Sequence, residues 1–248
     1  MPRVFVSTAD ISADIVSIEG SDARHLGLVL RLKPGDSFVA VDEFGREHTA
    51  AVTSIEPGLI TGRIVATRTP ETESKVRISL AQAVPKAKKM DMIVEKCTEL
   101  GVGAIIPMMT ERVVTQPDEA KMAERAERWQ RIATEAAKQS HRTIIPEVHP
   151  VVRLESAVDE LAQLDLCLLF SEAEQQRPLR EVLGRGIRVS SLGLAIGPEG
   201  GFSVQEVEMA VAAGAVPVTL GLRILRTETA AIAALSICLY ELGEMGER

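Results

Sequence analysis

Aromatic residues are scarce in this sequence, since Phe, Trp and Tyr make up only 3% of its 248 residues. Much of the 46% hydrophobic content is aliphatic, which favours a layered α/β core over an aromatic-rich β-sandwich. Cysteine is also rare: Cys97, Cys167 and Cys238 lie far apart and fit neither a disulfide framework nor a zinc motif. We expect all three to be small buried core residues.

Signals for export, membrane insertion or metal binding are missing as well. The sequence begins with no basic stretch followed by an apolar run, and no uncharged apolar stretch reaches spanning length; the closest candidate, residues 229–240, is too short. None of the four histidines has a Cys or carboxylate at a metal-ligand or catalytic-triad spacing. We therefore expect a cytoplasmic protein with no membrane partner and no metal, and a metallohydrolase or serine hydrolase has no support.

A net positive charge is found in only one part of the chain. The net charge of −7 argues against nonspecific binding of a polyanion by the whole surface. Only residues 76–150 are net basic, with 12 Lys and Arg against 10 Asp and Glu. A polyanionic partner is therefore expected to dock on this middle third.

Residues 1–72 have the pattern of a small β-rich domain. Short alternating or β-branched runs lie between turn sequences rich in Pro, Gly and charged residues. The expected strands are residues 4–7, 37–41, 48–55 and 60–67, and the expected helix is residues 21–31, capped by Ser21. Strands this short and closely spaced favour a small barrel. The polar, Pro-containing residues 68–74 mark the domain boundary.

From residue 73 to residue 248, strands alternate with helices. We expect strands at residues 76–84, 104–108, 164–170, 192–196 and 216–220, and helices at residues 90–100, 119–140, 178–183, 203–213 and 228–241. This alternation is typical of an α/β domain with a mostly parallel sheet and helices on both faces.

The last helix has no charged side chain between residues 229 and 240. The surface helix of a monomer normally has a polar stripe, so this helix needs a cover on both sides. We expect a homodimer formed through it, and the alternative is a helix fully enclosed in a monomer core.

A glycine-rich loop is the clearest candidate site. The sequence AIGPEGGFS, residues 195–203, runs from an apolar strand through three glycines into a helix, with Ser203 and Glu206 spaced as a capping box. Glycines at the carboxyl end of a strand let a ligand approach the backbone, and open α/β sheets bind ligands at that edge. The loop fits neither the dinucleotide nor the phosphate-loop motif, and a plain tight turn would explain the same residues.

A second loop has the same context. In LGLRILRTETA, residues 220–230, an apolar strand again leads into a helix, with Thr227 as the expected cap and Glu228 at the positive end of the helix. Arg223 and Arg226 are unusual beside so apolar a helix, although pairing with surface carboxylates would also account for them.

Basic side chains follow several strands and helices of the middle third. They are Lys86, Lys88 and Lys89 after the first strand, Arg112 after the second, and Lys138 and Arg142 at the end of the long helix. Such loops can converge on a phosphate backbone, although single lysines are more often solvated surface charges.

Six segments, taken in order, carry a family resemblance. They are MPRVFV, HLGLVLRLKPGD, KMDMIVEKCTELGVGAIIPMMTERVV, RWQRIATEAAKQSHR, LAIGPEGGFSVQEVEMA and LGLRILRTETAAIAAL. Together they resemble the bacterial small-subunit (16S) ribosomal RNA (uracil-N3)-methyltransferases of the SPOUT class over essentially the whole chain. The combination of GPEGG with LRTETA is the family-specific part.

The resemblance implies a PUA-like RNA-binding β-barrel over residues 1–72 and a SPOUT α/β methyltransferase domain with a deep trefoil knot over residues 73–248. It also implies a homodimer, S-adenosyl-L-methionine (SAM) as methyl donor, and N3 of a uridine in the decoding region of 16S ribosomal RNA, within the small subunit, as target. Lys138 and His141 depart from the family pattern on the expected RNA side and leave the cofactor loops intact.

Carried over to this chain, the family's cofactor pocket is formed by three adjacent loops. Its residues are Leu169, Ser171, Glu172, Ile196, Gly197, Pro198, Glu199, Gly200, Gly201, Leu220, Gly221, Ile224, Leu225, Arg226, Thr227 and Thr229. The candidate RNA contacts are Arg24, Arg31, Lys86, Lys88, Lys89, Arg112 and Arg142.

The chemistry of methyl transfer points to three catalytic candidates, Arg226, Glu228 and Glu199. Uracil N3 is a poor nucleophile while it carries its proton, so the site must remove that proton or stabilise the resulting anion. Arg226 is the candidate for holding the negative charge on the uracil carbonyls, because a guanidinium is charged at any working pH. Glu228 or Glu199 is the candidate base. The target base must also leave its stack or pairing partner.

Three other functions are compatible with parts of this pattern. A SPOUT methyltransferase acting on another RNA would have the same loops. A noncatalytic RNA-binding or assembly factor would keep the fold and would not bind SAM. An unrelated α/β nucleotide-binding enzyme is disfavoured, because the phosphate-loop and dinucleotide motifs are missing.

Overall fold

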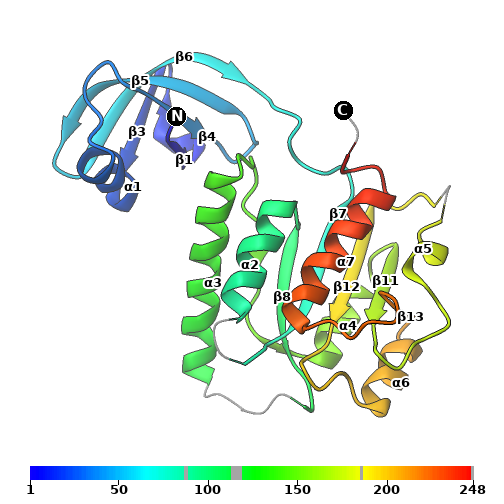
Figure 1. The fold of residues 1–248 in the computed structure, drawn as a ribbon. Helices are drawn as coiled ribbons and strands as arrows, with labels where there is room; N and C mark the ends of the chain where they lie inside the picture. The colour runs from blue at the N-terminus through cyan, green and yellow to red at the C-terminus, as the bar shows by residue number, and fades with distance from the viewer. Residues whose placement is uncertain (87–88, 113–118, 185–186, 247–248) are drawn as a thin grey trace. The chain divides into compact units, whose positions relative to one another are not determined.

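A computed structural model describes residues 1–86, 89–112, 119–184 and 187–246 of the chain (Figure 1). The chain forms two compact units. The first contains Met1–Glu73 and Ala137–Ile144, and the second contains Ser74–Ala136 and Ile145–Arg248. Residues 137–144 were expected in the second domain, as the end of its long helix and the turn after it. They belong instead to the N-terminal unit.

The first unit is built on a six-stranded sheet. Its strands are β1 (Arg3–Phe5), β2 (Ile11–Ser12), β3 (Ile15–Glu19), β4 (Ser37–Val41), β5 (Glu47–Glu56) and β6 (Leu59–Arg68), and a 3₁₀ turn, η1, covers Thr8–Asp10. The strand order is β1-β4-β5-β6-β3-β2, and every pair except β1 with β4 is antiparallel. All four expected strands are present, whereas β2 and β3 were missed. Closure into a barrel stays a prediction.

The expected helix of this unit is shorter than predicted and differently capped. Helix α1 covers Gly20–Arg24 and continues as a π-helical turn, η2, over His25–Val29. The N-cap is Glu19 and makes no side-chain cap bond, so the prediction that Ser21 caps this helix was wrong. Leu26 of η2 packs with the core of the sheet.

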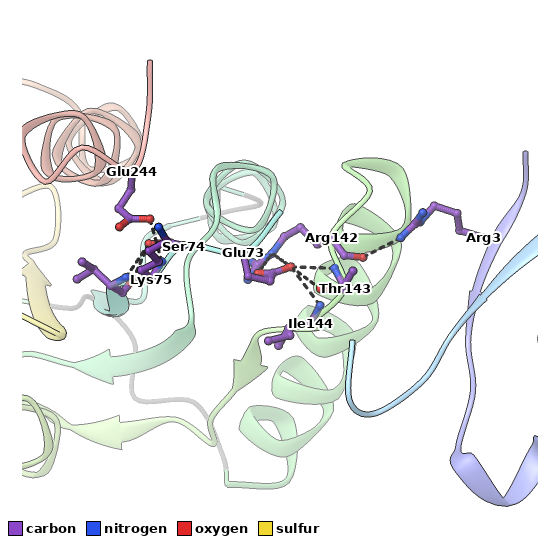
Figure 2. A network of polar contacts seen from close by, with 9 residues as sticks. Arg3, Glu73, Ser74, Lys75, Arg142, Thr143, Ile144 and Glu244 are labelled. Atoms are coloured by element: carbon purple, nitrogen blue, oxygen red, sulfur yellow. Dashed lines mark hydrogen bonds and ion pairs between the residues drawn. The ribbon is translucent and has the colours of Figure 1, made fainter. Parts of the chain in front are cut away.

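A half-buried carboxylate holds the end of the first unit. Glu73 accepts hydrogen bonds from the backbone N–H groups of Thr143 at 2.8 Å and Ile144 at 3.2 Å, and it pairs with the Arg142 guanidinium at 2.7 Å (Figure 2). Arg3 in turn donates to the carbonyl oxygen of Arg142 at 3.3 Å. These contacts explain why residues 137–144 fold with the N-terminal strands. In the second unit, the N–H of Lys75 donates to Glu244 at 2.8 Å.

The second unit contains a seven-stranded sheet. Its strands are β7 (Arg77–Ala83), β8 (Ala104–Met109), β9 (Glu147–Val148), β10 (Val152–Arg153), β11 (Leu166–Phe170), β12 (Ser191–Ile196) and β13 (Val216–Val218). The order is β10-β8-β7-β12-β11-β13, with β9 also paired to β8, and every pair is parallel. The predicted parallel sheet is therefore confirmed. Strand β12 lies between β7 and β11 although β11 precedes it in the chain, and the trefoil knot stays a prediction.

Helices cover both faces of this sheet, as predicted. They are α2 (Lys89–Leu100), α3 (Glu119–Gln139), α4 (Leu154–Leu161), α5 (Leu179–Val182), α6 (Val204–Ala212) and α7 (Thr227–Glu241). Alternate residues of β7 point to opposite faces: Ile78 and Leu80 join the core under α2, α3 and α7, and Ala81 and Ala83 join the core under α4 and α6. Helix α4 was not predicted.

The three cysteines are buried and free, as expected. Burial raises the pKa of Cys97 and Cys238 to about 12 and that of Cys167 to about 11, so all three are neutral thiols at physiological pH. None of the helices within the described residues combines the length and apolar character needed to cross a bilayer.

Candidate active site

A cleft of about 600 Å³ opens at the carboxyl ends of β11, β12 and β13. These strands are parallel neighbours, so the loops that follow them meet at one edge of the sheet. The cleft is lined by Ser171 after β11, by Gly197 and Pro198 after β12, and by residues 219–225 after β13. The two loops singled out in the sequence therefore lie side by side.

Most of the predicted pocket residues line this cleft. They are Ser171, Glu172, Ile196, Gly197, Pro198, Gly201, Leu220, Gly221, Ile224, Leu225 and Thr227. The lining also includes residues that sequence reasoning missed, namely Phe170, Glu174, Gln175, Pro178, Val218, Thr219, Leu222, Arg223 and Ala230. Residues 174–178 had no signal, because their polar sequence is typical of any surface turn.

Five predicted residues lie outside the lining: Leu169, Glu199, Gly200, Arg226 and Thr229. Leu169 packs into the core under α4 and α6, because strand alternation turns its side chain away from the face on which its neighbour Phe170 lies. Arg226 is the exposed N-cap of α7, directly beside the lining residues Leu225 and Thr227.

Glycines and a cap determine the path of the first loop. A Cβ at Gly197 would stand 3.2 Å from the Phe202 ring, so a side chain there would press on the buried aromatic. Gly201 has a φ of 66°, a left-handed conformation that glycine adopts without strain. The capping box predicted for Ser203 and Glu206 is confirmed, since each side chain accepts a hydrogen bond from the other's backbone N–H.

A buried hydroxyl joins the two loops. Thr227 Oγ1 donates to the carbonyl oxygen of Gly197 at 2.7 Å and accepts from Gln82 Nε2 at 3.0 Å. The expectation that Thr227 caps α7 was wrong, because Thr227 is the first residue of the helix. The N-cap is Arg226, whose side chain makes no capping hydrogen bond. Sequence reasoning also missed Gln82, which is fully buried, although an amide between Ala81 and Ala83 near the end of a strand was an available signal.

The two candidate bases share one ammonium group. Lys89 Nζ lies 2.9 Å from Glu199 Oε1 and 3.3 Å from Glu228 Oε2. Burial opposes the ionisation of Glu199, but hydrogen bonds from Lys89 and from nearby backbone amides outweigh it and lower the pKa of Glu199. The hydrogen bond to Glu199 also raises the pKa of Lys89. Lys89 and Glu199 are therefore a charged pair at neutral pH.

The predicted RNA contacts have different environments. Lys86 and Arg112 are exposed in the second unit, where Arg112 donates to the carbonyl oxygen of Gly200 at 2.6 Å. Arg24 and Arg31 are exposed in the first unit. Arg142 is 5% exposed and ion-paired with Glu73. Lys88 lies outside the described residues.

Within the described ranges, no three His, Cys, Asp or Glu side chains gather closely enough to hold a metal ion.

Comparison with known proteins links both units to RNA modification. The family model of the RNA methyltransferase domain matches residues 72–239, and that of the RNA methyltransferase PUA domain matches residues 18–65. Ribosomal RNA small subunit methyltransferase E of Synechocystis is 35% identical over 94% of this chain and 76% of its own length.

Solved structures of methyltransferases are also similar to this chain over nearly its whole length. Ribosomal RNA small subunit methyltransferase E of Neisseria gonorrhoeae, bound to S-adenosyl methionine, is 34% identical with a TM-score of 0.85 over 96% of this chain and 97% of that one. A Legionella pneumophila protein solved with bound SAM is 33% identical with a TM-score of 0.87 over 96% of each chain.

Proposed function

We propose that this chain, a member of the family of ribosomal RNA small subunit methyltransferases E, transfers a methyl group from SAM to N3 of a uridine in 16S ribosomal RNA. The observation that carries the proposal is the cleft formed by the two adjacent loops, at the edge of the sheet where α/β proteins bind ligands. Relatives similar over nearly the whole chain have been solved with this donor.

The cleft suits this donor in size and lining. A volume of about 600 Å³ lies within the range of small-molecule sites. Apolar side chains of Ile196, Leu220 and Leu225 offer a surface for a flat base, while Gly197 and Gly221 leave backbone polar groups open to approach. The proposed cofactor residues are the predicted ones that line the cleft.

In the proposed mechanism, the protein orients the uracil and manages its N3 proton. Bound SAM supplies an electrophilic methyl group on a sulfonium. Arg226, exposed beside the cleft, stabilises the negative charge on the uracil carbonyls as the N3 proton leaves. Glu228 or Glu199 accepts that proton, and Lys89 holds both carboxylates next to the loops that line the cleft.

RNA contacts are proposed for the exposed cations of both units. Lys86 and Arg112 lie near the carboxyl edge of the second sheet, and Arg24 and Arg31 lie on the first unit. Arg142 would have to leave Glu73 to reach a phosphate, so we assign it to holding residues 142–144. A cytoplasmic location, where ribosomal subunits are found, is part of this proposal.

A homodimer is also part of the proposal. Helix α7 buries Ala231, Leu235 and Cys238 against its own sheet, while Ile237 and Tyr240 on its other side stay exposed. This outer face, apolar and uncharged, is the surface that a second copy would cover.

Calorimetric titration with SAM and a methylation assay on small subunits from cells lacking the protein test the function together. We expect saturable binding of SAM and one new N3-methyluridine in 16S ribosomal RNA. Failure to bind SAM would favour a noncatalytic RNA-binding factor. Binding of SAM with methylation of a different RNA would point to the alternative substrate.

Arg226→Ala tests the proposed role of the guanidinium. Loss of a charge-stabilising group in the transition state is expected to lower turnover by about 100-fold while the affinity for SAM stays near that of the wild type. Arg188→Ala, at an exposed arginine shortly before β12 that does not line the cleft, is the control and should keep wild-type turnover. Wild-type turnover in Arg226→Ala would contradict the assignment.

A further inference from the structure

Two polar bridges connect the loop that starts at Gly197 with the N-terminus of α7. One bridge involves Gln82 of β7, and the other involves Lys89, the first residue of α2. The buried bridge runs from Gln82 through Thr227 to Gly197, and the outer bridge runs from Lys89 to Glu199 and Glu228. None of Gln82, Lys89, Glu199 or Glu228 lines the cleft.

The outer bridge is well placed to set the shape of the cleft. Glu199 follows the lining residue Pro198, and Glu228 follows the lining residue Thr227. Because each carboxylate residue is bonded directly to a lining residue, a shift of either one also moves the wall of the cleft. The buried Oε2 of Glu228 accepts no hydrogen bond from any described residue, so the ammonium 3.3 Å away is what compensates its charge.

Removing the ammonium leaves two carboxylates unpaired beside each other. The Glu228 side chain is only 14% exposed, so an unpaired charge there is poorly solvated. Repulsion between the two carboxylates would separate the loops that Lys89 now draws together. Although burial opposes its ionisation, the hydrogen bond from Lys89, with a smaller contribution from the backbone of Lys86, lowers the pKa of Glu199 and keeps this carboxylate charged.

We propose that Lys89 is a positioning residue for the methyl donor, which acts by holding Glu199 and Glu228 together, and that it is not an RNA phosphate contact. This inference rests on the proposed function, because it takes SAM to be the ligand of the cleft. It assigns opposite roles to two lysines of one segment: Lys89, 31% exposed and paired to both carboxylates, and Lys86, exposed and without an ion pair to any described residue.

The test compares Lys89→Met with Lys86→Met in the full-length protein. The affinity for SAM is measured by calorimetry, and the affinity for an unmodified decoding-region transcript is measured over a series of salt concentrations. Lys89→Met is expected to weaken SAM binding by about tenfold or more, the factor for a lost charge-assisted hydrogen bond, and to leave the salt slope for RNA unchanged. Lys86→Met should keep the SAM affinity and reduce the salt slope by about one.

Two further measurements separate positioning from folding. Lys89→Arg keeps a cation and should restore most of the SAM affinity, and kinetics of Lys89→Met should show a raised KM for SAM with the KM for RNA unchanged. Should Lys89→Met not fold, Glu199→Gln breaks the Lys89–Glu199 half of the bridge and leaves Glu228 paired, so it is expected to weaken SAM binding by a smaller factor.

The outcomes distinguish this inference from the proposed function. Wild-type protein that binds no SAM would overturn the function itself. Wild-type protein that binds SAM, together with a Lys89→Met variant of equal SAM affinity and reduced salt slope for RNA, would overturn only the role given to Lys89.

Discussion

At the scale of single residues, the Thr227 hydroxyl connects the two loops of the cleft. It donates to the carbonyl oxygen of Gly197 and accepts from Gln82, and Thr227 and both partners are buried. A buried polar atom that loses its partner is destabilised by its full desolvation penalty. The hydroxyl therefore matters more than its small size suggests.

Replacing this hydroxyl by a methyl group tests that view. Thr227→Val keeps the shape of the side chain but leaves Gly197 and Gln82 without their partner, which should lower the free energy of unfolding by about 1–3 kcal/mol and weaken SAM binding. Thr227→Ser, which keeps the hydroxyl, is the matched control and should bind SAM nearly as well as the wild type. Equal unfolding temperatures and equal SAM affinities of Thr227→Val and Thr227→Ser, measured by thermal unfolding and calorimetry, would show that the bridge has no energetic role.

The residues that sequence could assign are those governed by local rules. The capping box at Ser203 follows from a three-residue spacing and was predicted correctly. The role of Thr227 was missed because its partner, Gly197, is thirty residues away in the chain. Leu169 was chosen in place of Phe170 because a strand that is apolar on both faces gives no signal of which side chain faces the ligand.

At the scale of elements, Asp165 ties β11 to β12 at the edge of the sheet where both strands begin. Its Oδ2 accepts from the N–H and hydroxyl of Ser190, both at 2.7 Å, and from the N–H of Ser191 at 2.9 Å. The hydroxyl of Ser190, followed by the two backbone amides, lowers the pKa of Asp165 to about 2. The charged carboxylate is therefore the form that the folded state prefers.

This preference predicts a pH-dependent stability. The folded pKa of about 2 lies below the ordinary aspartate value of 3.8, so the stabilisation is fully present above pH 3.8 and is lost as the pH falls towards 2. Wild type should exceed Asp165→Asn in unfolding temperature at pH 6, and the difference should shrink between pH 4 and pH 2. Ser190→Ala, which removes one of the three donors, should show a smaller difference in the same direction. A difference that is constant with pH would contradict the assignment.

The type of element could be predicted more reliably than its neighbours in space. The alternation of strands and helices indicated a parallel sheet, and the sheet is parallel throughout. Hydrophobic periodicity does not say which strands pair, so the place of β12 between β7 and β11 could not be deduced. Short elements such as β10, with two residues, have too little sequence to show a period.

At the scale of the whole molecule, the outer face of α7 is the surface with a direct consequence for assembly. Tyr240 is 66% exposed and Ile237 is 38% exposed, on a helix without charge from Thr229 to Tyr240. Exposed apolar side chains on one helix face mark an interaction surface. We expect particles of twice the 26.8 kDa chain mass in sedimentation experiments.

A charged substitution should separate the proposed dimer. Ile237→Glu would place a carboxylate in the apolar contact, where burial of an unpaired charge is strongly unfavourable, so particles of the single chain mass are expected at micromolar concentration. Val65→Glu, at an exposed position of β6, is the control and should leave the mass unchanged. Single-chain particles for the wild type would contradict the homodimer.

The division of the chain was only partly predictable from sequence. The polar segment 68–74 suggested where the first unit ends, because it interrupts two regions of different periodicity. The inclusion of residues 137–144 in that unit depends on Glu73 binding to the backbone of Thr143 and Ile144, a contact between distant segments that no local pattern reveals.

A crystal structure of this protein soaked with SAM decides whether the two loops form one binding site. We predict the donor in the cleft, touching both the loop that begins at Gly197 and residues 220–227, with Lys89 between Glu199 and Glu228. A donor bound elsewhere, or one that touches only one of the two loops, would contradict the account.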